Sequence, residues 1–460
     1  MSSAVDARRP QPAVAALVCG LWAAAIAVAP GVAAKALLAA PAILLPLAWW
    51  SLYRPARWIS LFFLAALLLP PLPIPIGDSG PHPCLLFAAL GLFAGMIRLA
   101  DWRIELTAVS GGLIALFGIL LASVGLAAMD SGLTAAAGSL ARVALFGISV
   151  YVFFYAAYGP GRESHSGLAT LYGAAVASAL FACVDFYYQF PAPAGYGPQF
   201  VWLDSGVYRR AQGLFYEAST LGNFCAFFLV MIAVALTRPR GEAPVSRKAL
   251  WMGGAVFFAA LVLSYSRASL INVAVALAVL GWLNRKRVRL GKLAAILAAG
   301  VGAAGYVTWK VFPQFVEMYW LRLSLSAEYL FSATSGVLSG RVESWHTLMA
   351  WISAHPWLTL SGIGYKTLPY TDFLGAPVVA DNMYLSLLVE TGVAGLAALL
   401  FLNVAILRAA RRSDARGSFF GTWMLCFWAG QTVQMFSGDL LTYWRVLPVY
   451  LWVLALAVRA

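Results

Sequence analysis

Apolar runs long enough to cross a lipid bilayer recur along almost the whole chain, and they restrict the fold more than any other feature. An α-helix needs roughly 20 apolar residues to span the hydrocarbon core, where every backbone polar group must be satisfied internally. Charged residues make up only 11% of the chain, against about 25% in soluble domains. The sequence therefore predicts an all-α polytopic membrane protein, with residues 1–460 forming a single membrane-embedded domain.

About 14 spans are predicted from length and apolar composition. They are residues 13–34, 36–53, 58–76, 83–99, 105–128, 133–157, 167–190, 217–237, 249–265, 268–284, 292–312, 383–407, 418–436 and 441–458. The run 58–76 ends in the proline-rich PPLPIPIG, and the run 292–312 is short and rich in Ala and Gly. The first run is longer than the core of a typical signal peptide, so we interpret it as a span.

Basic residues determine the predicted orientation, because the cytoplasmic loops of membrane proteins are enriched in Lys and Arg. With the N-terminus in the cytoplasm, most of the 31 Lys and Arg residues fall on the inner side, as in the loop RKRVRLGK at 285–292. Both termini are then cytoplasmic. The basic residues on the inner side face anionic membrane lipids, and their excess explains the net charge of +13 without a nucleic-acid partner.

The outer side carries the long extramembrane segment 309–382 and a second large loop near 191–216. Within the first, PQFVEMYWLRLSLSAEYLF (313–331) indicates a helix lying at the membrane interface. SGRVESWHTLMAWISAHP (339–356) indicates a short amphipathic helix that begins after Gly340 and stops at Pro356. The segment is too short and too apolar for an independent soluble domain, so we predict a lid on the membrane domain.

Polar groups gather at the outer ends of the spans, first in YRRAQGLFYEAST (208–220). Arg210 is followed three residues later by Gly213, and Glu217 opens a span. The helix dipole favours Glu217 there in any case, and Arg and Tyr are common interface anchors. Two adjacent arginines on the translocated side nevertheless favour a functional role.

Arg267 lies in SYSRASL (264–270), a tight turn between two spans. A guanidinium between helix ends offers a planar fork of donors that suits a phosphate. Contact with lipid headgroup phosphates is an equal alternative. Arg341 opens the predicted lid helix, where backbone N–H groups also favour anions.

Asp381 and Asn382 stand directly before an apolar run in DNMYLSLLVETGVAGL (381–396). Either residue type is a good helix N-cap. A cap needs only one such residue, so capping does not explain why both are present. Gly392 and Gly395, further along the run, permit close packing of helices.

No metal site or disulfide framework is predicted. The five cysteines lie in or beside apolar runs without paired spacing, so we interpret them as packing residues. His346 and His355 follow no metal-ligand pattern.

The order of these motifs and their common side resemble the bacterial O-antigen ligase and O-antigen polymerase family of membrane glycosyltransferases. The resemblance covers about 200–410. The matching elements are R-x-x-G (Arg210, Gly213), S-x-S-R (Ser264, Ser266, Arg267), G-R-x-x-x-W (Gly340, Arg341, Trp345), a proline followed by G-x-G (Pro356, Gly362, Gly364), and a polar pair followed by G-x-x-G (Asp381, Asn382, Gly392, Gly395).

The resemblance implies a GT-C-like fold in the bacterial inner membrane and an active site on the periplasmic face. It implies a glycan donor linked to undecaprenyl pyrophosphate. A ligase passes the glycan to the lipid A core, and a polymerase passes it to another lipid-linked repeat unit. Neither a metal nor another cofactor is expected. Arg210, Arg267 and Arg341 would stabilise the charge of the leaving pyrophosphate.

Two carboxylates are candidates for the base that activates the acceptor hydroxyl, with Asn382 and Gly213 in supporting roles. Ligases usually have His-Asn where this chain has Asp381-Asn382. An aspartate is a weak base unless burial raises its pKa. Glu217 is the rival base, and Glu217-Ala218-Ser219 resembles polymerase members more than ligases.

A transporter or flippase for a lipid-linked glycan is the main alternative. It would place paired charges near the bilayer midplane, whereas Arg142, Asp185 and Glu390 lie nearer the outer ends of their spans. A non-catalytic envelope scaffold is a third possibility that leaves the outward arginines without a purpose.

Overall fold

The protein is described by a computed structural model, and most of the chain is helical. The model describes residues 12–53, 57–72, 81–160, 167–193, 196–203, 206–239, 245–285, 341–370 and 378–459, with isolated positions between 306 and 324. Its helices are α1 (Pro12–Val28), α2 (Gly31–Tyr53), α3 (Arg57–Leu68), α4 (Cys84–Ile97), α5 (Ala108–Tyr158), α6 (Gly167–Tyr188), α7 (Ala218–Thr237), α8 (Arg247–Leu263), α9 (Arg267–Leu283), α12 (Arg341–Ala354), α13 (Pro356–Ser361), α14 (Met383–Ala415), α15 (Phe419–Gln434) and α16 (Leu447–Arg459). The predicted helices 292–312 and 313–331 fall almost wholly outside the described residues.

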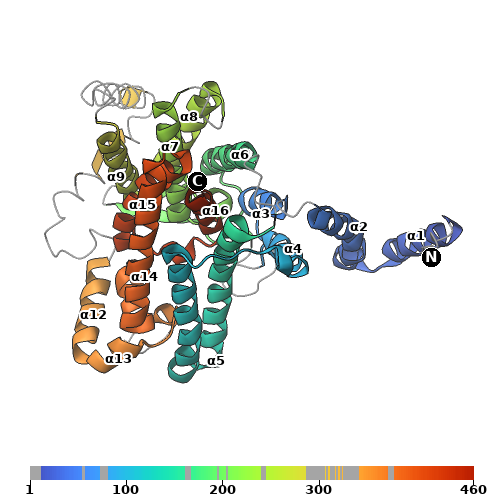
Figure 1. The fold of residues 1–460 in the computed structure, drawn as a ribbon, viewed down its shortest axis with the longest axis horizontal. Coiled ribbons are helices and arrows are strands. Elements are labelled where there is room, and N and C mark those ends of the chain that lie inside the picture. Colours follow the sequence, from blue (N-terminus) through green and yellow to red (C-terminus); the bar gives the residue numbers. More distant parts are fainter. Residues whose placement is uncertain are drawn as a thin grey trace, which may run out of the picture.

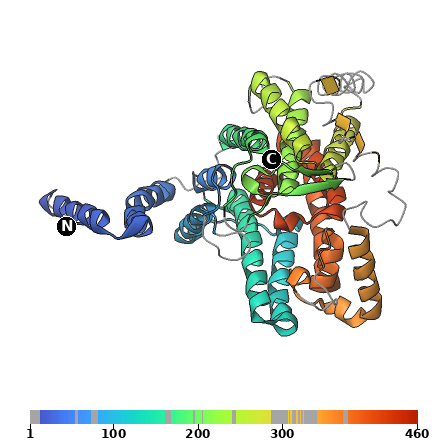
Figure 2. The same ribbon diagram turned by 180° about the vertical axis from the view of Figure 1, so that it is seen from behind.

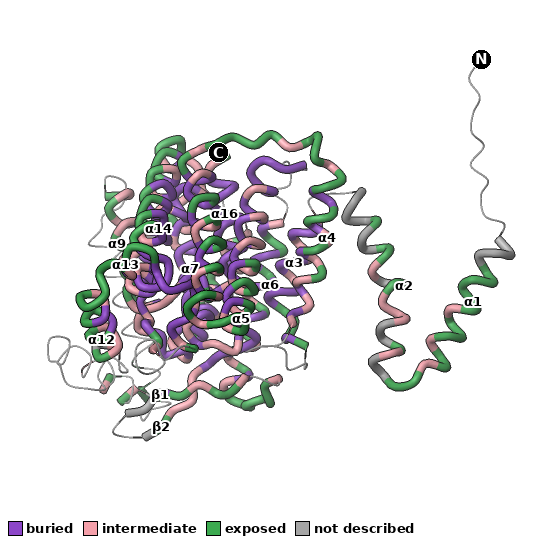
Figure 3. Tube along the Cα trace, turned by 90° about the horizontal axis from the view of Figure 1, so that it is seen from below, coloured by how far each residue is buried: buried purple, intermediate pink, exposed green. Residues whose placement is uncertain are grey.

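Helices α3 to α9 and α14 to α16 form one bundle, from which α1 and α2 extend to one side (Figures 1 and 2). In the most apolar stretch of α7, 78% of the residues are buried. Its aromatic residues pack on α15 and α16, as where Phe227 contacts Trp423 and Tyr450. Buried residues fill the interior of the bundle, and exposed residues follow its outside (Figure 3).

Large apolar side chains also cover the outside of the bundle, among them Trp251 and Trp282. By length and composition, α5, α6, α7 and α14 are each able to cross a membrane, and several shorter helices are also apolar. An apolar exterior of this kind suits a lipid environment. The fold class is therefore a mostly helical membrane protein, and the number of 14 spans stays a prediction.

Helix α5 contains two antiparallel arms that meet at Gly132, where φ is +86° (Figures 1 and 2). The arms pack closely, since a Cβ on Gly147 would lie 2.9 Å from the ring of Phe117. This geometry matches the separate predicted helices 105–128 and 133–157.

Two predictions need correction. The helix predicted over 58–76 ends at Leu68, because Pro70 and Pro71 provide no N–H donors to continue it. The fold is also not purely all-α: β1 (Phe200–Leu203) and β2 (Gly206–Arg209) form an antiparallel hairpin in the predicted outer loop 191–216. Aromatic and β-branched residues in FVWL and GVYR favour strands.

The prediction of one continuous helix over 383–407 is also wrong, because α14 breaks at Gly392 (φ +73°, ψ −171°). The segment after α13 crosses the chain there, and Ile363 and Gly364 donate backbone hydrogen bonds to the carbonyls of Val389 and Glu390, at 3.1 and 2.8 Å. A Cβ on Gly392 would lie 2.2 Å from the carbonyl oxygen of Leu360. Gly392 thus serves a chain crossing, not the helix packing predicted from the sequence.

We expect Gly392→Ala to destabilise the protein by about 3 kcal/mol, because it combines backbone strain with overpacking. Thermal unfolding of the purified protein in detergent would measure this. Gly118→Ala is the matched control, since a Cβ on Gly118 in α5 meets nothing within 4 Å. Equal unfolding temperatures for the two variants would contradict the argument.

Candidate active site

A polar cavity of about 280 Å³ lies where several distant parts of the chain meet. It is lined by Arg142 of α5, by Glu217 and Ser219 at the start of α7, by Arg341 of α12, by Ser386 and Glu390 of α14, and by parts of the segments 366–370, 378–382 and 437–443. The described part of the predicted lid 309–382 therefore forms one wall of the cavity. Of the predicted site residues, Glu217, Arg341, Asp381 and Asn382 line it directly.

Glu217 is the N-cap residue of α7, yet its carboxylate makes no capping hydrogen bond. Gln199 satisfies the first amide of the helix instead, because its Oε1 accepts from the N–H of Ala218 at 2.9 Å. The Glu217 carboxylate accepts from the hydroxyls of Ser219 and Thr220, at 3.0 and 2.5 Å. Its position at the cavity is therefore not explained by helix capping alone.

Burial raises the pKa of the Glu217 carboxyl above its ordinary value. The hydrogen bonds from Thr220 and Ser219 and the charge of Arg210 oppose this rise only in part. A carboxyl group with a raised pKa is closer to the range in which a general base works at neutral pH.

Arg210 ties the loop before α7 to the turn between α8 and α9. Its Nε donates to the carbonyl of Ser264 at 2.9 Å, and the N–H of Ala211 donates to the carbonyl of Leu263 at 2.9 Å. Arg267 begins α9 directly after this turn, as the sequence predicts. Two motifs that are about 50 residues apart in the sequence are thereby joined through the backbone.

The three predicted arginines lie close enough to influence one another. Burial lowers the pKa of the Arg210 guanidinium, and the positive charges of Arg341 and Arg267 lower it further, while Glu217 raises it. A site that holds several cations near one buried guanidinium favours an anion.

Arg341 and Asp381 form an ion pair, with Nε donating to Oδ2 at 3.0 Å. The Asp381 side chain is 44% exposed and its φ is +44°. Trp345 holds the same segment, since its Nε1 donates to the carbonyl of Ala380 at 2.8 Å. Asp381 therefore lacks the burial that its prediction as a base required.

Asn382 has the capping role that the sequence allowed. Its Oδ1 accepts from the N–H groups of Tyr384 and Leu385, at 3.0 and 3.2 Å. Gly213 lies outside the cavity wall and allows a close approach to α6. Its φ is +54°, and a Cβ there would lie 2.6 Å from the Cβ of Ala182.

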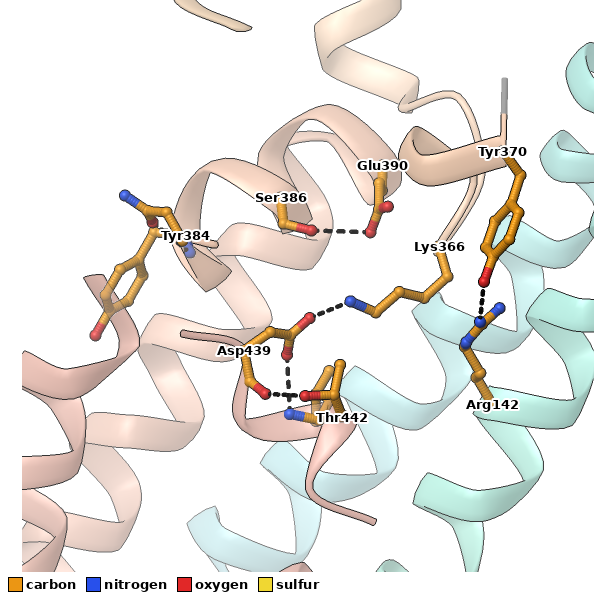
Figure 4. A network of polar contacts seen from close by, with 10 residues as sticks. Arg142, Lys366, Tyr370, Tyr384, Ser386, Glu390, Asp439 and Thr442 are labelled. Atoms are coloured by element: carbon orange, nitrogen blue, oxygen red, sulfur yellow. Dashed lines mark hydrogen bonds and ion pairs between the residues drawn. The ribbon is translucent and has the colours of Figure 1, made fainter. Parts of the chain in front are cut away.

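A second group of polar residues, not predicted from the sequence, lies in the same cavity (Figure 4). Lys366 forms an ion pair with Asp439, and Ser386 donates to Glu390 at 3.0 Å. Arg142 donates to the hydroxyl of Tyr370 at 2.7 Å. The sequence does contain one indication of this group, because Asp439 is the sole acidic residue in the turn between the last two predicted spans.

A network of buried amides lies among the helices that carry the site. Asn223 of α7 and Asn272 of α9 both donate to the side-chain oxygens of Gln431 and Gln434 of α15. Tyr450 of α16 donates to Asn223 at 2.7 Å. Such hydrogen bonds between apolar helices restrict their rotation and fix where each helix begins.

Comparison with known proteins identifies the relationship. Residues 252–400 match the family model described as O-antigen ligase. The match includes Arg267, Arg341 and the pair Asp381-Asn382, while Arg210 and Glu217 precede it. No curated protein matches the chain. The match supports glycan transfer in surface polysaccharide biosynthesis by a membrane protein, and residues 252–400 are similar to the O-antigen ligase family.

Proposed function

We propose that the protein transfers a glycan from undecaprenyl pyrophosphate to a hydroxyl group of an acceptor on the periplasmic face of the bacterial inner membrane. The acceptor is another lipid-linked repeat unit in a polymerase, or the lipid A core in a ligase. The observation that carries the proposal is one cavity lined by Glu217 and Arg341, whose charges act together with that of Arg267 on the buried Arg210 guanidinium.

In the proposed reaction, the acceptor oxygen attacks the anomeric carbon of the donor glycan. A new carbon–oxygen bond forms, and the bond from the anomeric carbon to the phosphate oxygen breaks. The diphosphate on undecaprenol leaves with the electron pair, and the acceptor proton passes to a carboxylate. The guanidinium groups of Arg210, Arg267 and Arg341 stabilise the negative charge that develops on the diphosphate.

Glu217 is the base in this proposal. Its burial raises its pKa, and its carboxylate makes no capping hydrogen bond to the backbone of α7. The exposed Asp381 is paired with Arg341, and in the proposal this pair orients the guanidinium. Tyr443 lines the same cavity as Glu217 and Ser219.

The topology is part of the proposal. The cavity is lined by described residues of the segment 309–382, by the start of α7 and by the turn 437–443, and in this proposal all of them lie on the periplasmic side. Both termini are then cytoplasmic, and 309–382 covers the site as a lid in a GT-C-like arrangement of about 14 spans. The reaction needs no metal in this proposal, because the arginines supply the positive charge.

Reconstitution in vitro tests the proposed function. The purified protein, supplied with a lipid-linked glycan isolated from the source cells and with membranes that hold the acceptor, is expected to form transferred glycan and free undecaprenyl pyrophosphate. A chelator is expected to leave the rate unchanged. A transporter or scaffold would leave the donor intact under the same conditions, and an intact donor in every preparation would contradict the proposal.

A further inference from the structure

The residues that the sequence analysis missed divide the cavity into two ends with different chemistry. The first end, called the arginine end, has Arg341, Glu217 and Asp381 in the cavity wall, and the charges of Arg341, Glu217 and Arg267 act on the buried guanidinium of Arg210 beside it. The second, called the lysine end, contains Lys366, Asp439, Glu390, Ser386, Arg142 and Tyr370 (Figure 4). We propose that the lysine end binds the hydroxyl groups of a sugar ring, while the arginine end binds the diphosphate. This inference rests on the proposed function and deepens it.

The balance of charge separates the two ends. At the arginine end, Arg341 lines the cavity together with two carboxyl groups, and the neighbouring charges of Arg210 and Arg267 bring the number of guanidinium groups to three, which favours an added diphosphate. At the lysine end, the cations Lys366 and Arg142 are matched by the carboxyl groups of Asp439 and Glu390. A diphosphate placed there would lie against two carboxyl groups, and like charges in a buried site repel strongly. A neutral ligand fits this end better.

The donors and acceptors at the lysine end suit a polyol. The Lys366 ammonium has three N–H donors and is bonded to Asp439, and burial lowers its pKa less than Asp439 and Glu390 raise it. Asp439 also accepts from the N–H of Leu441 at 2.9 Å. Each carboxylate has about four lone-pair sites, so both carboxyl groups retain acceptor capacity for sugar hydroxyls. The ring of Tyr370 adds an aromatic face, with the Arg142 guanidinium 5.1 Å from its centroid.

The lysine end is held in place by contacts between distant segments. The Lys366–Asp439 ion pair joins the segment after α13 to the turn before α16. Lys366 has φ +58°, and its backbone N–H hydrogen bonds to the Glu390 carboxyl group. A Cβ on Gly364 would lie 2.5 Å from the backbone of Ala127, so this segment also packs tightly on α5. A site whose side chains are held rigidly in this way is suited to recognise the geometry of a ligand.

Tyr443 connects the two ends. It lines the cavity together with Glu217 of the arginine end and Asp439 of the lysine end, and the charges of Glu217, Asp439 and Asp381 all act on its hydroxyl. A sugar ring bound at the lysine end would therefore lie next to both the diphosphate and the carboxylate of Glu217. That is where either the departing donor sugar or the acceptor sugar must lie.

The experiment compares binding of two lipids with glycan transfer, using the purified full-length protein. The lipids are bare undecaprenyl pyrophosphate and the lipid-linked glycan isolated from the source cells. The variants are Glu390→Gln, Ser386→Ala and Tyr370→Phe, of which the last two each remove one hydroxyl group and keep the charges. Glu343→Gln and Asp414→Asn are controls, because Glu343 is exposed on α12 and Asp414 lies at the other end of α14.

All three variants are expected to bind bare undecaprenyl pyrophosphate within twofold of the unchanged protein and to transfer glycan at least tenfold more slowly. Weaker binding of the lipid-linked glycan would assign the lysine end to the donor sugar. Unchanged binding of both lipids with slower transfer would assign it to the acceptor sugar.

Two results would overturn the inference: weaker binding of bare undecaprenyl pyrophosphate by these variants, or transfer that is unchanged in Ser386→Ala and Tyr370→Phe. Failure of the proposed function would differ, because the unchanged protein would then form no product, and Arg210→Ala would bind undecaprenyl pyrophosphate normally.

Discussion

Glu217→Gln is expected to slow glycan transfer by about 10²- to 10⁴-fold, the usual contribution of a general base. The substitution keeps the size of the side chain, and the amide can still pair with both hydroxyls, accepting from one and donating to the other, so the start of α7 stays in place. Initial rates at saturating donor would show the loss in kcat, with binding of undecaprenyl pyrophosphate little changed. Asp381→Asn is expected to weaken binding of the lipid diphosphate, because it releases Arg341.

The dependence of the rate on pH gives a second readout for Glu217. The reactive form is the ionised carboxylate, so the rate rises as pH increases through the Glu217 pKa. Because burial raises that pKa, the acidic limb of the profile should lie at higher pH than for an exposed glutamate. The limb should vanish in Glu217→Gln. A limb that persists there but vanishes in Asp381→Asn would transfer the role to Asp381.

Arg210→Ala is expected to lower the transfer rate by about 10²- to 10³-fold, the usual cost of removing one preorganised group that stabilises developing charge. It removes a buried guanidinium, the bond to Ser264 and the coupling to Arg267 and Arg341. Arg267→Ala and Arg341→Ala should act in the same direction. Binding of undecaprenyl pyrophosphate should weaken in all three variants.

The neighbouring Arg209 offers a matched control for Arg210. Its guanidinium lies 3.6 Å from Asp185 on α6, so its charge is compensated away from Arg341 and Arg267. Arg209→Ala should therefore keep most of the transfer activity. Equal losses in Arg209→Ala and Arg210→Ala would indicate a general effect on the hairpin and would contradict the assignment of Arg210 to the diphosphate. Polymer or ligated glycan in cells that carry each variant checks the same comparison.

The parts of the fold that depend on short stretches of sequence were predictable. Apolar length located most of the described helices, and motif spacing selected Arg210, Arg267 and Arg341, whose charges the fold brings together. The early end of the third helix was also predictable, because Pro70 and Pro71 indicate that a helix stops before them.

The features that depend on contacts between distant segments could not be predicted. The residues next to Gly392 in the sequence are typical of a helix. Only the passage of residues 360–364 beside it explains the break in α14. Lys366 and Asp439 are 73 positions apart, and neither has a local pattern that indicates the other. The charge balance of the lysine end appears only when both are placed with Glu390 and Arg142.

The hydrogen bond from Ala218 to Gln199 has a further consequence for evolution of the site. The uncharged side chain of Gln199, in a connecting loop, accepts from the first amide of α7, directly after the proposed base. Substituting that amide would leave an amide hydrogen at the helix start unpaired, and the adjoining carboxylate could turn to meet it. Relatives with an intact glutamate could thus lose catalysis through a change about 20 residues upstream.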